Sequence, residues 1–421
     1  MKQQIFMAVS ISISLLTGSV WAGQSLVTNG NNDGPGSLRA ALASGANTIR
    51  FQDDVQNINL TETLTRENPN KLRILGSGQS INASAIDPDS DILSISGAGD
   101  VVISDLVLLG SFDAVNEDPL LPAGGKGIEI LVPVEAQGLI KVKISDLFLT
   151  RVGHHGIHIS DCSLGDDCGG GSGGGGDGSS ASLMLKLEKV QVSGVGFGRA
   201  DADGVRVDER GDGSIYFTSK DSVFTKVGAD GVELDEGNDG DVVSSVSRSL
   251  FSDNGEYCNL IPVFEGGPCD DDGDRDVDDG FDIDEAGEGG LYSRVRDSQV
   301  TNNFDEGLDF DEEDAGDIES AVIDTIGLGN QDEAFKMSEE GDGDLNVLLR
   351  KITTADNNGG KEGIELEEAD DGNVAVRVVK SLMIGGEDEE LKIEQADTGV
   401  GTVKVRNSNL GGLDLENVIE Q

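Results

Sequence analysis

Basic and aromatic side chains are scarce in this sequence. Its 421 residues include 30 Lys and Arg against 80 Asp and Glu, the formal net charge is −50, and aromatic residues make up 4%. Binding to nucleic acid phosphates or to anionic lipid headgroups requires clustered Lys and Arg, which the linear sequence does not show. We therefore expect no nucleic acid among its partners. The scarcity of aromatics also leaves few rings to stack on sugars.

Long hydrophobic runs are also missing. The apolar segment 5–16 follows a short basic N-terminus, and residues 20–22, Val-Trp-Ala, form the small-residue pattern that signal peptidase reads. We expect residues 1–22 to be a signal peptide and the mature protein to be secreted, either extracellular or periplasmic. No later segment has about 18 consecutive apolar residues, so we expect no membrane span.

The cysteines fall into two pairs that are local in sequence. Cys162 lies near Cys168, and Cys258 lies near Cys269. An even number of cysteines suits an oxidising compartment. We predict two short loops, each closed by its own disulfide.

A six-residue pattern recurs about every 27 residues. Clear copies read GVRVDE from Gly204, GVELDE from Gly231, GFDIDE from Gly280, GLDFDE from Gly307 and GIELEE from Gly363. The steps from 156 to 204 and from 231 to 280 are nearly doubled, and each contains one cysteine pair. We interpret these steps as coils with insertions, near 162–179 and 255–277.

The repeat predicts parallel strands. Alternation with period two indicates strands with one buried face, and each repeat contains three short alternating segments separated by Gly, Asn and Asp turns. Such units stack into a solenoid of parallel sheets. Asn254, Asn303, Asn330 and Asn357 share one position of the repeat, so we expect their amides to form a ladder across the coils.

The N-terminal region carries a family resemblance. Residues 27–42, VTNGNNDGPGSLRAAL, and the segments 49–51 and 58–61 resemble the start of secreted right-handed parallel β-helix proteins of the pectin-lyase-like superfamily. The repeated Gly-apolar-polar-apolar units are similar to the generic coil repeat of that group. The resemblance implies the fold more strongly than the activity.

The predicted fold is therefore all-β, a right-handed parallel β-helix of about 12 coils of roughly 27 residues. The N-terminal cap and first strands occupy 23–70, and the coil repeats occupy 71–421. Ser37 is expected to N-cap a short helix that covers the first coil. A short or absent C-terminal cap would leave a strand edge through which the chain could self-associate.

Acidic residues form four columns across the coils. Two lie at the outward positions of the repeated strand, one with Asp282 and Asp309 and the other with Asp284 and Asp311; a third, from Glu209 to Glu368, lies at the end of the strand, and a fourth, from Asp203 to Glu389, lies just before the repeated glycine. Residues two apart on a strand point to the same face, and neighbouring strands are about 4.8 Å apart, so adjacent carboxylates repel by roughly 1 kcal/mol in water. Bound Ca²⁺ would offset this repulsion, and a hydrated acidic face with raised pKa values is the alternative. The calcium ligands that we predict on the repeated strands are Asp282, Asp284, Glu285, Asp309, Asp311 and Glu312.

The second insertion adds an acidic cluster. Asp274, Asp276, Asp278 and Glu285 match positions 1, 3, 5 and 12 of an EF-hand loop, but position 6 is Asp279 where Gly is expected. The EF-hand match is therefore weak. We still predict calcium in this insertion, with Asp272, Asp274, Asp276 and Asp278 as ligands.

All three histidines lie in one short segment, 154–158. We expect His158 to face outward between Glu129 and Arg206 of the neighbouring coils, beside Asp208. A histidine with a carboxylate and a guanidinium nearby can perform acid–base chemistry or hold a metal, and a structural role at the surface is the other interpretation. The candidate catalytic residues are His158, Arg206 and Asp208.

Two functions fit these features. The first is a secreted, calcium-stabilised β-helix that binds an extracellular polysaccharide or a surface component. The second, implied by the resemblance, is a polysaccharide-cleaving lyase or hydrolase that acts in a groove along the β-helix. The sequence shows no Asn-Thr-Asp or Arg-Ile-Lys element of the pectinase-type hydrolases, so binding is favoured and catalysis stays open.

Overall fold

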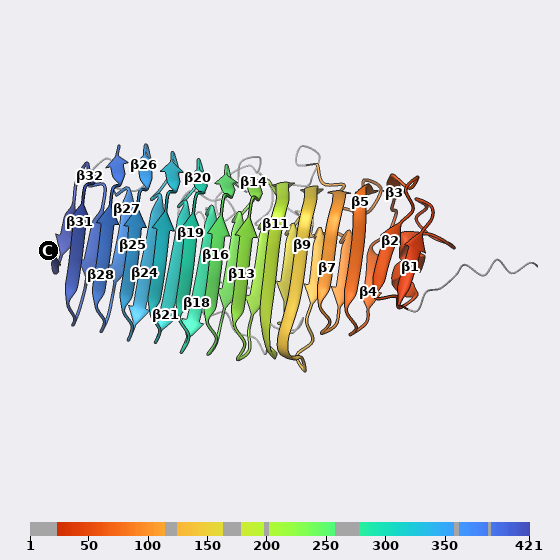
Figure 1. Cartoon of the computed structure of the whole chain (residues 1–421), viewed down its shortest axis with the longest axis horizontal. Helices are drawn as coiled ribbons and strands as arrows, with labels where there is room; N and C mark the ends of the chain where they lie inside the picture. The colour runs from red at the N-terminus through yellow and green to blue at the C-terminus, as the bar shows by residue number, and fades with distance from the viewer. Residues whose placement is uncertain are drawn as a thin grey trace, which may run out of the picture.

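The computed structural model describes residues 23–113, 124–162, 178–197, 202–256, 278–357, 362–385 and 389–421. Figure 1 shows an elongated solenoid whose coils follow one another from the N-terminal to the C-terminal end. The described residues form one sheet of 22 strands and one of 12 strands. Strands of successive coils pair in parallel. The prediction of an all-β parallel β-helix is confirmed.

The 12-stranded sheet takes one strand from each coil. Its strands are β4 (Leu64–Glu67), β6 (Leu93–Ser96), β8 (Ile128–Leu131), β10 (Ile157–Ser160), β12 (Val205–Glu209), β15 (Val232–Glu236), β18 (Phe281–Gly287), β21 (Leu308–Asp314), β24 (Phe335–Gly341), β27 (Ile364–Glu368), β30 (Lys392–Gln395) and β33 (Asp414–Glu416).

The 22-stranded sheet contains the rest of each coil. After three short strands near the N-terminus come four long strands, and then pairs of a longer and a shorter strand. Its strands are β1 (Gln24–Val27), β2 (Thr48–Phe51), β3 (Asn57–Asn59), β5 (Leu72–Asn82), β7 (Val101–Leu109), β9 (Gln137–Val152), β11 (Ser180–Val195), β13 (Ile215–Lys220), β14 (Val223–Val227), β16 (Val242–Ser247), β17 (Leu250–Ser252), β19 (Leu291–Arg296), β20 (Gln299–Thr301), β22 (Ile318–Ile323), β23 (Ile326–Leu328), β25 (Leu345–Arg350), β26 (Thr353–Ala355), β28 (Val374–Val379), β29 (Leu382–Ile384), β31 (Gly401–Arg406), β32 (Asn409–Leu410) and β34 (Val418–Glu420).

The interior is filled by side chains that stack from coil to coil. The ring of Phe251 lies between those of Phe224 and Phe281, with centroid distances of 5.2 and 5.6 Å. The predicted asparagine ladder is confirmed. The Nδ2 atoms of Asn254, Asn303 and Asn330 each donate to the Oδ1 atom of the next rung, at 3.2, 3.0 and 3.1 Å, and the last acceptor is Asn357.

A short helix, α1 (Leu38–Ala43), lies at the N-terminal end of the solenoid (Figure 1). The Ser37 side chain accepts a hydrogen bond from the backbone N–H of Ala40, which is the geometry of an N-cap. Leu38, Ala41 and Leu42 are buried against the first strands. The role of α1 in shielding the core stays a prediction.

Several predicted features fall outside the described residues. These are the signal peptide, most of both insertions, and three of the four cysteines. The fourth, Cys162, is buried at the end of β10. Both disulfides therefore stay predictions. Within the described residues, no helix is long and apolar enough to cross a membrane.

Candidate functional site

The register of the 12-stranded sheet aligns the predicted outward columns. Asp282 on β18 pairs with Glu233 on β15 and with Asp309 on β21. Asp284 pairs in the same way with Asp235 and Asp311. Because side chains two apart share a face, both columns lie on the outer surface of this sheet.

The predicted orientation of the third column is wrong. Its glutamates were expected at the water-facing side, but all are 0 or 1% exposed; they are Glu209, Glu236, Glu285, Glu312, Glu339 and Glu368. Each has the strand parity of the buried apolar residues, as Glu285 has with Phe281 and Ile283. Glu285 and Glu312, predicted as calcium ligands beside Asp284 and Asp311, therefore lie on the opposite face of the strand.

This interior glutamate column is electrostatically coupled. Burial, followed by the neighbouring carboxyl of Glu285, raises the pKa of Glu312 to about 8. Burial, followed by the hydrogen bond and charge of Glu312, raises the pKa of Glu339 to about 9. In the coil after Glu368 the equivalent residue is Gln395, whose amide donates to Glu368. The column thus holds protonated carboxyls near neutral pH.

The fourth column of acids lies just before the repeated glycines, and backbone hydrogen bonds hold its carboxylates in place. The backbone N–H of Asp230 donates to Asp203 Oδ1 at 3.2 Å, and that of Asp279 donates to Asp230 Oδ1 at 2.6 Å. The N–H of Glu306 donates in turn to Asp279 Oδ1 at 2.7 Å. Each carboxylate is therefore anchored to the next coil.

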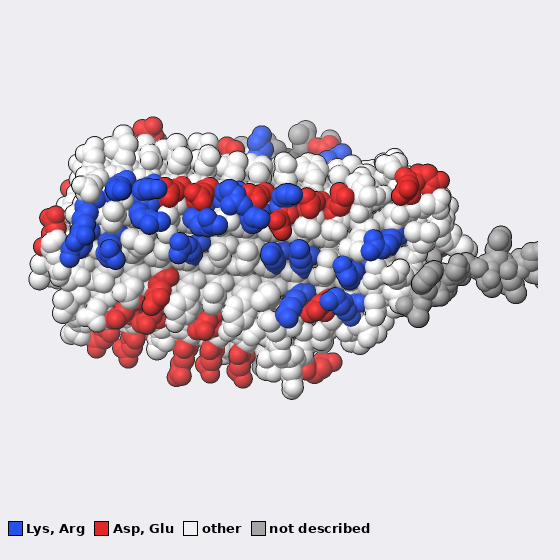
Figure 2. All heavy atoms as spheres, in the orientation of Figure 1, with Lys and Arg blue, Asp and Glu red and all other residues white. Residues whose placement is uncertain are grey.

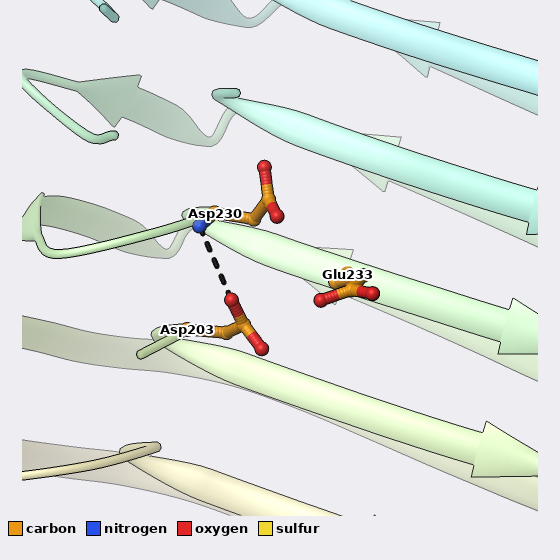
Figure 3. Close-up of side chains that lie close together, drawn as sticks. All are labelled: Asp203, Asp230 and Glu233. Atoms are coloured by element: carbon orange, nitrogen blue, oxygen red, sulfur yellow. Dashed lines mark hydrogen bonds between the residues drawn. The ribbon is translucent and has the colours of Figure 1, made fainter. Parts of the chain in front are cut away.

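Three-carboxylate groups arise where this fourth column meets the outward column. In each group one oxygen per residue lies within 4.8 Å of the others, and the groups are Asp203–Asp230–Glu233, Asp279–Glu306–Asp309 and Glu333–Glu362–Glu365. Figure 3 shows the first, in which two aspartates from adjacent coils and a glutamate on β15 lie close together. The three groups use the same positions of the coil. A fourth group, Glu233–Asp282–Asp284, joins the two outward columns.

The charges on this face are only partly balanced by the chain's own cations. Lys336 Nζ lies 2.7 Å from Asp309 and 3.6 Å from Glu306, and Lys392 Nζ lies 2.7 Å from Glu365. Among the described residues, neither Asp282 nor Asp284 has a basic partner within 4 Å.

The pKa values of Asp282 and Asp284 reflect the excess of negative charge on this face. Burial, followed by the charge of Asp235, raises the pKa of Asp284 to about 7. Burial, followed by Asp284, raises the pKa of Asp282 well above its usual range. The segment around Asp282 and Asp284 is therefore a place where an external cation would relieve repulsion.

The structure brings the three predicted catalytic residues together. His158 Nε2 lies 2.6 Å from Asp208 Oδ2, and Arg206 Nε lies 2.7 Å from Asp208 Oδ1. Lys126 completes the cluster, because its Nζ lies 2.8 Å from His158 Nδ1 and 2.8 Å from Glu129 Oε1. Lys126 is not among the predicted site residues; it precedes the coil glycine at the position where later coils carry an acid.

Arg206 links this cluster to the acidic columns. Its guanidinium contacts Asp203 at 3.4 Å and Asp235 at 3.0 Å, and it also pairs with Glu233. Burial alone would raise the pKa of Asp208, but Arg206 and His158 outweigh it and keep that pKa below its usual range. Asp208 is thus ionised at neutral pH.

The His158 ring is engaged at both nitrogens. Nε2 lies against the carboxylate of Asp208, and Nδ1 lies beside Lys126 Nζ. Burial alone would lower the pKa of His158, but the hydrogen bonds to Asp208 and Glu129 and the charge of Asp208 outweigh it and raise that pKa above its usual value. The residue is 7% exposed. These two contacts fix the ring within the sheet face.

The remaining predicted ligands divide between two regions. Asp272, Asp274 and Asp276 lie outside the described residues, while Asp278 directly precedes the coil that contains β18. The EF-hand-like loop therefore stays a prediction. Asp230 and Glu306 belong to the fourth column and are not among the predicted ligands. Their proximity to Glu233 and Asp309 depends on the three-dimensional path between coils.

Comparison with known proteins points to the fold. No family model and no curated protein matches the sequence. The chain is similar to the Dettilon tailspike protein, with a TM-score of 0.51 and 10% identity over 93% of this chain and 68% of that one.

Two further structures are similar at lower scores. Tailspike protein 2 of Escherichia coli O157:H7 bacteriophage CAB120 has a TM-score of 0.48 and 11% identity over 81% of this chain, which spans 40% of that protein. The A-module of the Azotobacter vinelandii mannuronan C-5 epimerase AlgE4 has a TM-score of 0.45 and 11% identity, covering 93% of this chain and 96% of that one. Together with the parallel coils, the likeness to the Dettilon tailspike protein shows that this chain is a parallel β-helix protein.

Proposed function

We propose that this protein is a calcium-stabilised β-helix that works outside the cell as a binding protein for a polysaccharide or another surface component. The observation that carries the proposal is the recurrence of one three-carboxylate group at the same coil positions. Because the acids of each group occupy equivalent positions of the coil, the repeat itself brings them together, and their proximity is not accidental.

Calcium fits the chemistry of these groups. All ligands are carboxylate oxygens, which hard cations prefer, and Ca²⁺ accepts six to eight oxygens in flexible geometry. Three carboxylates cannot fill that number alone when each binds through one oxygen. The open positions would accept water or an anionic group of a glycan, which links cation uptake to carbohydrate binding.

Burial argues against a merely hydrated acidic face. Asp279, Glu306 and Asp309 are 8, 7 and 8% exposed, so water reaches little of their surface. Buried carboxylates must be protonated, paired or bound to a cation. Burial, followed by Glu306, raises the pKa of Asp279 well above its usual range, and a bound cation would take the place of that proton.

The cleavage alternative receives less support. His158 has both nitrogens occupied, and its partners Asp208 and Arg206 are themselves held by several charged groups. These residues form a closed ion-pair network, which stabilises the sheet face. Binding is therefore the better-supported function.

The proposal is tested on the mature, disulfide-intact protein by thermal unfolding with Ca²⁺, Mg²⁺ or a chelator at equal ionic strength. A ligand that binds only the folded state stabilises it by about 2.7 kcal/mol at 100 times its Kd. We expect a rise in melting temperature that saturates with Ca²⁺ and is much smaller with Mg²⁺. Equal curves in Ca²⁺ and chelator would reject calcium binding.

A further inference from the structure

The 22-stranded sheet carries a basic face, which is unexpected in a chain of net charge −50. Figure 2 shows Lys and Arg gathered along the middle of the face formed by the strands labelled β5 to β31 in Figure 1, with Asp and Glu mostly toward its margins. The linear sequence hides this cluster, because its members lie a whole coil or more apart.

Strand register places the basic residues in one row. From β9 to β31 the paired outward positions are Lys143, Lys186, Thr218, Ser245, Arg294, Ala321, Leu348, Arg377 and Lys404. None of these positions is acidic. We call this row the basic stripe. A parallel row adds Arg296, Arg350 and Arg406.

The cations of the basic stripe have no internal partners. Among the described residues, none of its five Lys and Arg side chains has a carboxylate within 4 Å, whereas Arg206, Lys336 and Lys392 on the other sheet all do. Lys143, Lys186, Arg294 and Arg377 are exposed, and Lys404 is half-buried. With 80 acids in the chain, this lack of pairing leaves the stripe available to an external anion.

Aromatic rings lie beside the stripe. Tyr216 and Tyr292 occupy the next outward row, separated by Val243 on the strand between them, and both are half-buried. The chain has only 3 tyrosines, so two of them on one face is a marked concentration. A tyrosine offers an apolar ring surface and a polar hydroxyl, which suits contact with a sugar ring.

The stripe ends in a hollow. A cavity of about 440 Å³ in the C-terminal coils is lined by Glu319, Asn346, Arg377, Thr402 and Lys404, among others. Two cations without a carboxylate partner thus share a concave site with Asn346 and Thr402, which offer hydrogen bonds, and with Glu319 and the C-terminal residue Gln421. Such a site can hold a charged substituent and the hydroxyls next to it.

We propose that the basic stripe binds a linear anionic polysaccharide, whose carboxylate or sulfate groups pair with Arg294, Arg377 and Lys404. The inference rests on the proposed function as a polysaccharide-binding protein, and it adds the ligand class and the face that binds it. It does not depend on calcium, because the stripe lies on the other sheet from the three-carboxylate groups.

A glycan fits this face better than other polyanions. Arg377 and Lys404 lie on adjacent strands, about 4.8 Å apart, which matches a chain with separate anionic groups along its length. Duplex DNA carries one charge per about 1.7 Å and would bring phosphates over the acidic margins of this face. The acidic sheet of a second copy is a poorer match, because its carboxylates are largely buried or already paired.

The test compares the wild type with Arg294→Gln/Arg377→Gln/Lys404→Gln by isothermal titration calorimetry in a chelator. The probes are polygalacturonate, dextran sulfate, neutral dextran and single-stranded DNA. The matched control is Lys71→Gln/Lys189→Gln/Lys226→Gln, which removes three exposed lysines outside the stripe. Thermal unfolding checks that both variants fold.

We expect the wild type and the control to bind at least one anionic glycan, with at least tenfold weaker binding in the stripe variant and no binding of neutral dextran. Comparing polygalacturonate with dextran sulfate distinguishes uronate from sulfate recognition. Unchanged affinity in the stripe variant would overturn the stripe proposal but leave a glycan-binding protein, whereas no binding of any glycan, with or without Ca²⁺, would reject both proposals.

Two other results would also overturn the stripe proposal. Tighter binding of single-stranded DNA than of either anionic glycan would assign the stripe to nucleic acid. A dimer in sedimentation experiments that the stripe variant loses, without any glycan affinity, would assign it to a second copy of the chain.

Discussion

The carboxyl group of Glu312 occupies space that a side chain on Gly316 would need, because a Cβ atom there would lie 2.6 Å from Glu312 Oε1. The same relationship joins Glu339 to Gly343, at 2.6 Å, and Gln395 to Gly399, at 2.9 Å. The interior glutamate column is therefore built into the repeat, together with a glycine four residues later. An ionised column without water or a cation would be strongly destabilising.

The first prediction concerns pH. Glu312 and Glu339 have folded-state pKa values of about 8 and about 9, above the value of about 4.3 in an unfolded chain. The folded state binds more protons between these values, so their stabilising effect is complete below about pH 4 and is lost as the pH rises to about 9. Glu312→Gln/Glu339→Gln should therefore flatten the pH dependence and stabilise the fold at pH 8.

Denaturant unfolding at pH 5, 7 and 9 measures this effect. The matched control is Glu340→Gln, which neutralises an exposed neighbour on the same strand. Gln395 already occupies the equivalent position in a later coil, so the amide should fit. Parallel stability curves for the double variant and the wild type would contradict the protonated column.

The second prediction locates the calcium site. Asp282→Asn/Asp284→Asn/Asp309→Asn/Asp311→Asn should reduce the calcium-induced rise in melting temperature. It removes ligands from two of the three-carboxylate groups, Glu233–Asp282–Asp284 and Asp279–Glu306–Asp309, and leaves the other two groups unchanged. The chelated form should become more stable than the chelated wild type, because four mutually repelling carboxylates, one buried and three half-buried, are neutralised. Calcium titrations followed by thermal unfolding measure both effects.

The control for that experiment removes the same number of charges elsewhere. Asp53→Asn/Asp54→Asn/Glu62→Gln/Glu67→Gln neutralises four exposed acids near the N-terminal end. It should keep the full calcium response. A full response in the Asp282 variant as well would exclude Asp282, Asp284, Asp309 and Asp311 as calcium ligands.

The third prediction concerns Arg206. Its guanidinium is the shared partner of Asp203, Asp208, Glu233 and Asp235. Removing one partner of a buried ion pair typically costs about 3–5 kcal/mol, because the remaining charge is uncompensated. Arg206→Ala should show a loss of this order in denaturant unfolding, whereas the exposed, unpaired Arg294→Ala should stay within about 0.5 kcal/mol of the wild type. Similar small effects at both sites would contradict the network.

The fourth prediction concerns the asparagine ladder. Asn303 donates to Asn330 and accepts from both the backbone N–H and the amide of Asn254. Asn303→Ala would leave buried polar groups without partners, at a cost of roughly 1–3 kcal/mol for each group. Ser245→Ala, at an exposed position of the same solenoid, serves as the control. Equal midpoints in urea for the two variants would count against a structural role for the ladder.

Periodicity explains why the coils and columns could be predicted. A repeat near 27 residues with alternation inside it determines which residues pair, so the pairing of Asp282 with Asp309 followed from counting. The same counting placed Glu285 at the end of the strand without showing that the strand continues to Gly287. Its burial follows from its parity with Phe281 and Ile283, and Glu209 and Glu236 are equally buried although their strands end at them.

Other features depend on three-dimensional neighbours that linear order does not display. The sequence gives no cluster of Lys and Arg, yet Arg377 and Lys404 become adjacent because they are one coil apart. Lys126 likewise reaches His158 only after the coils stack. Charge clusters in a repeat protein must therefore be sought at the period of the repeat, and not within a short sequence window.

The asparagine ladder and the paired strands join each coil only to its two neighbours. A gene segment that encodes one coil therefore encodes one structural unit. Duplication of one complete coil unit would lengthen the solenoid by about 4.8 Å and leave every side chain on its original face. A duplication that shifts the strand phase by one residue would exchange inner and outer residues in that coil. Gain or loss of whole coils would thus change the number of carboxylate groups and the length of the basic stripe together. The avidity for a polymeric ligand would change with them.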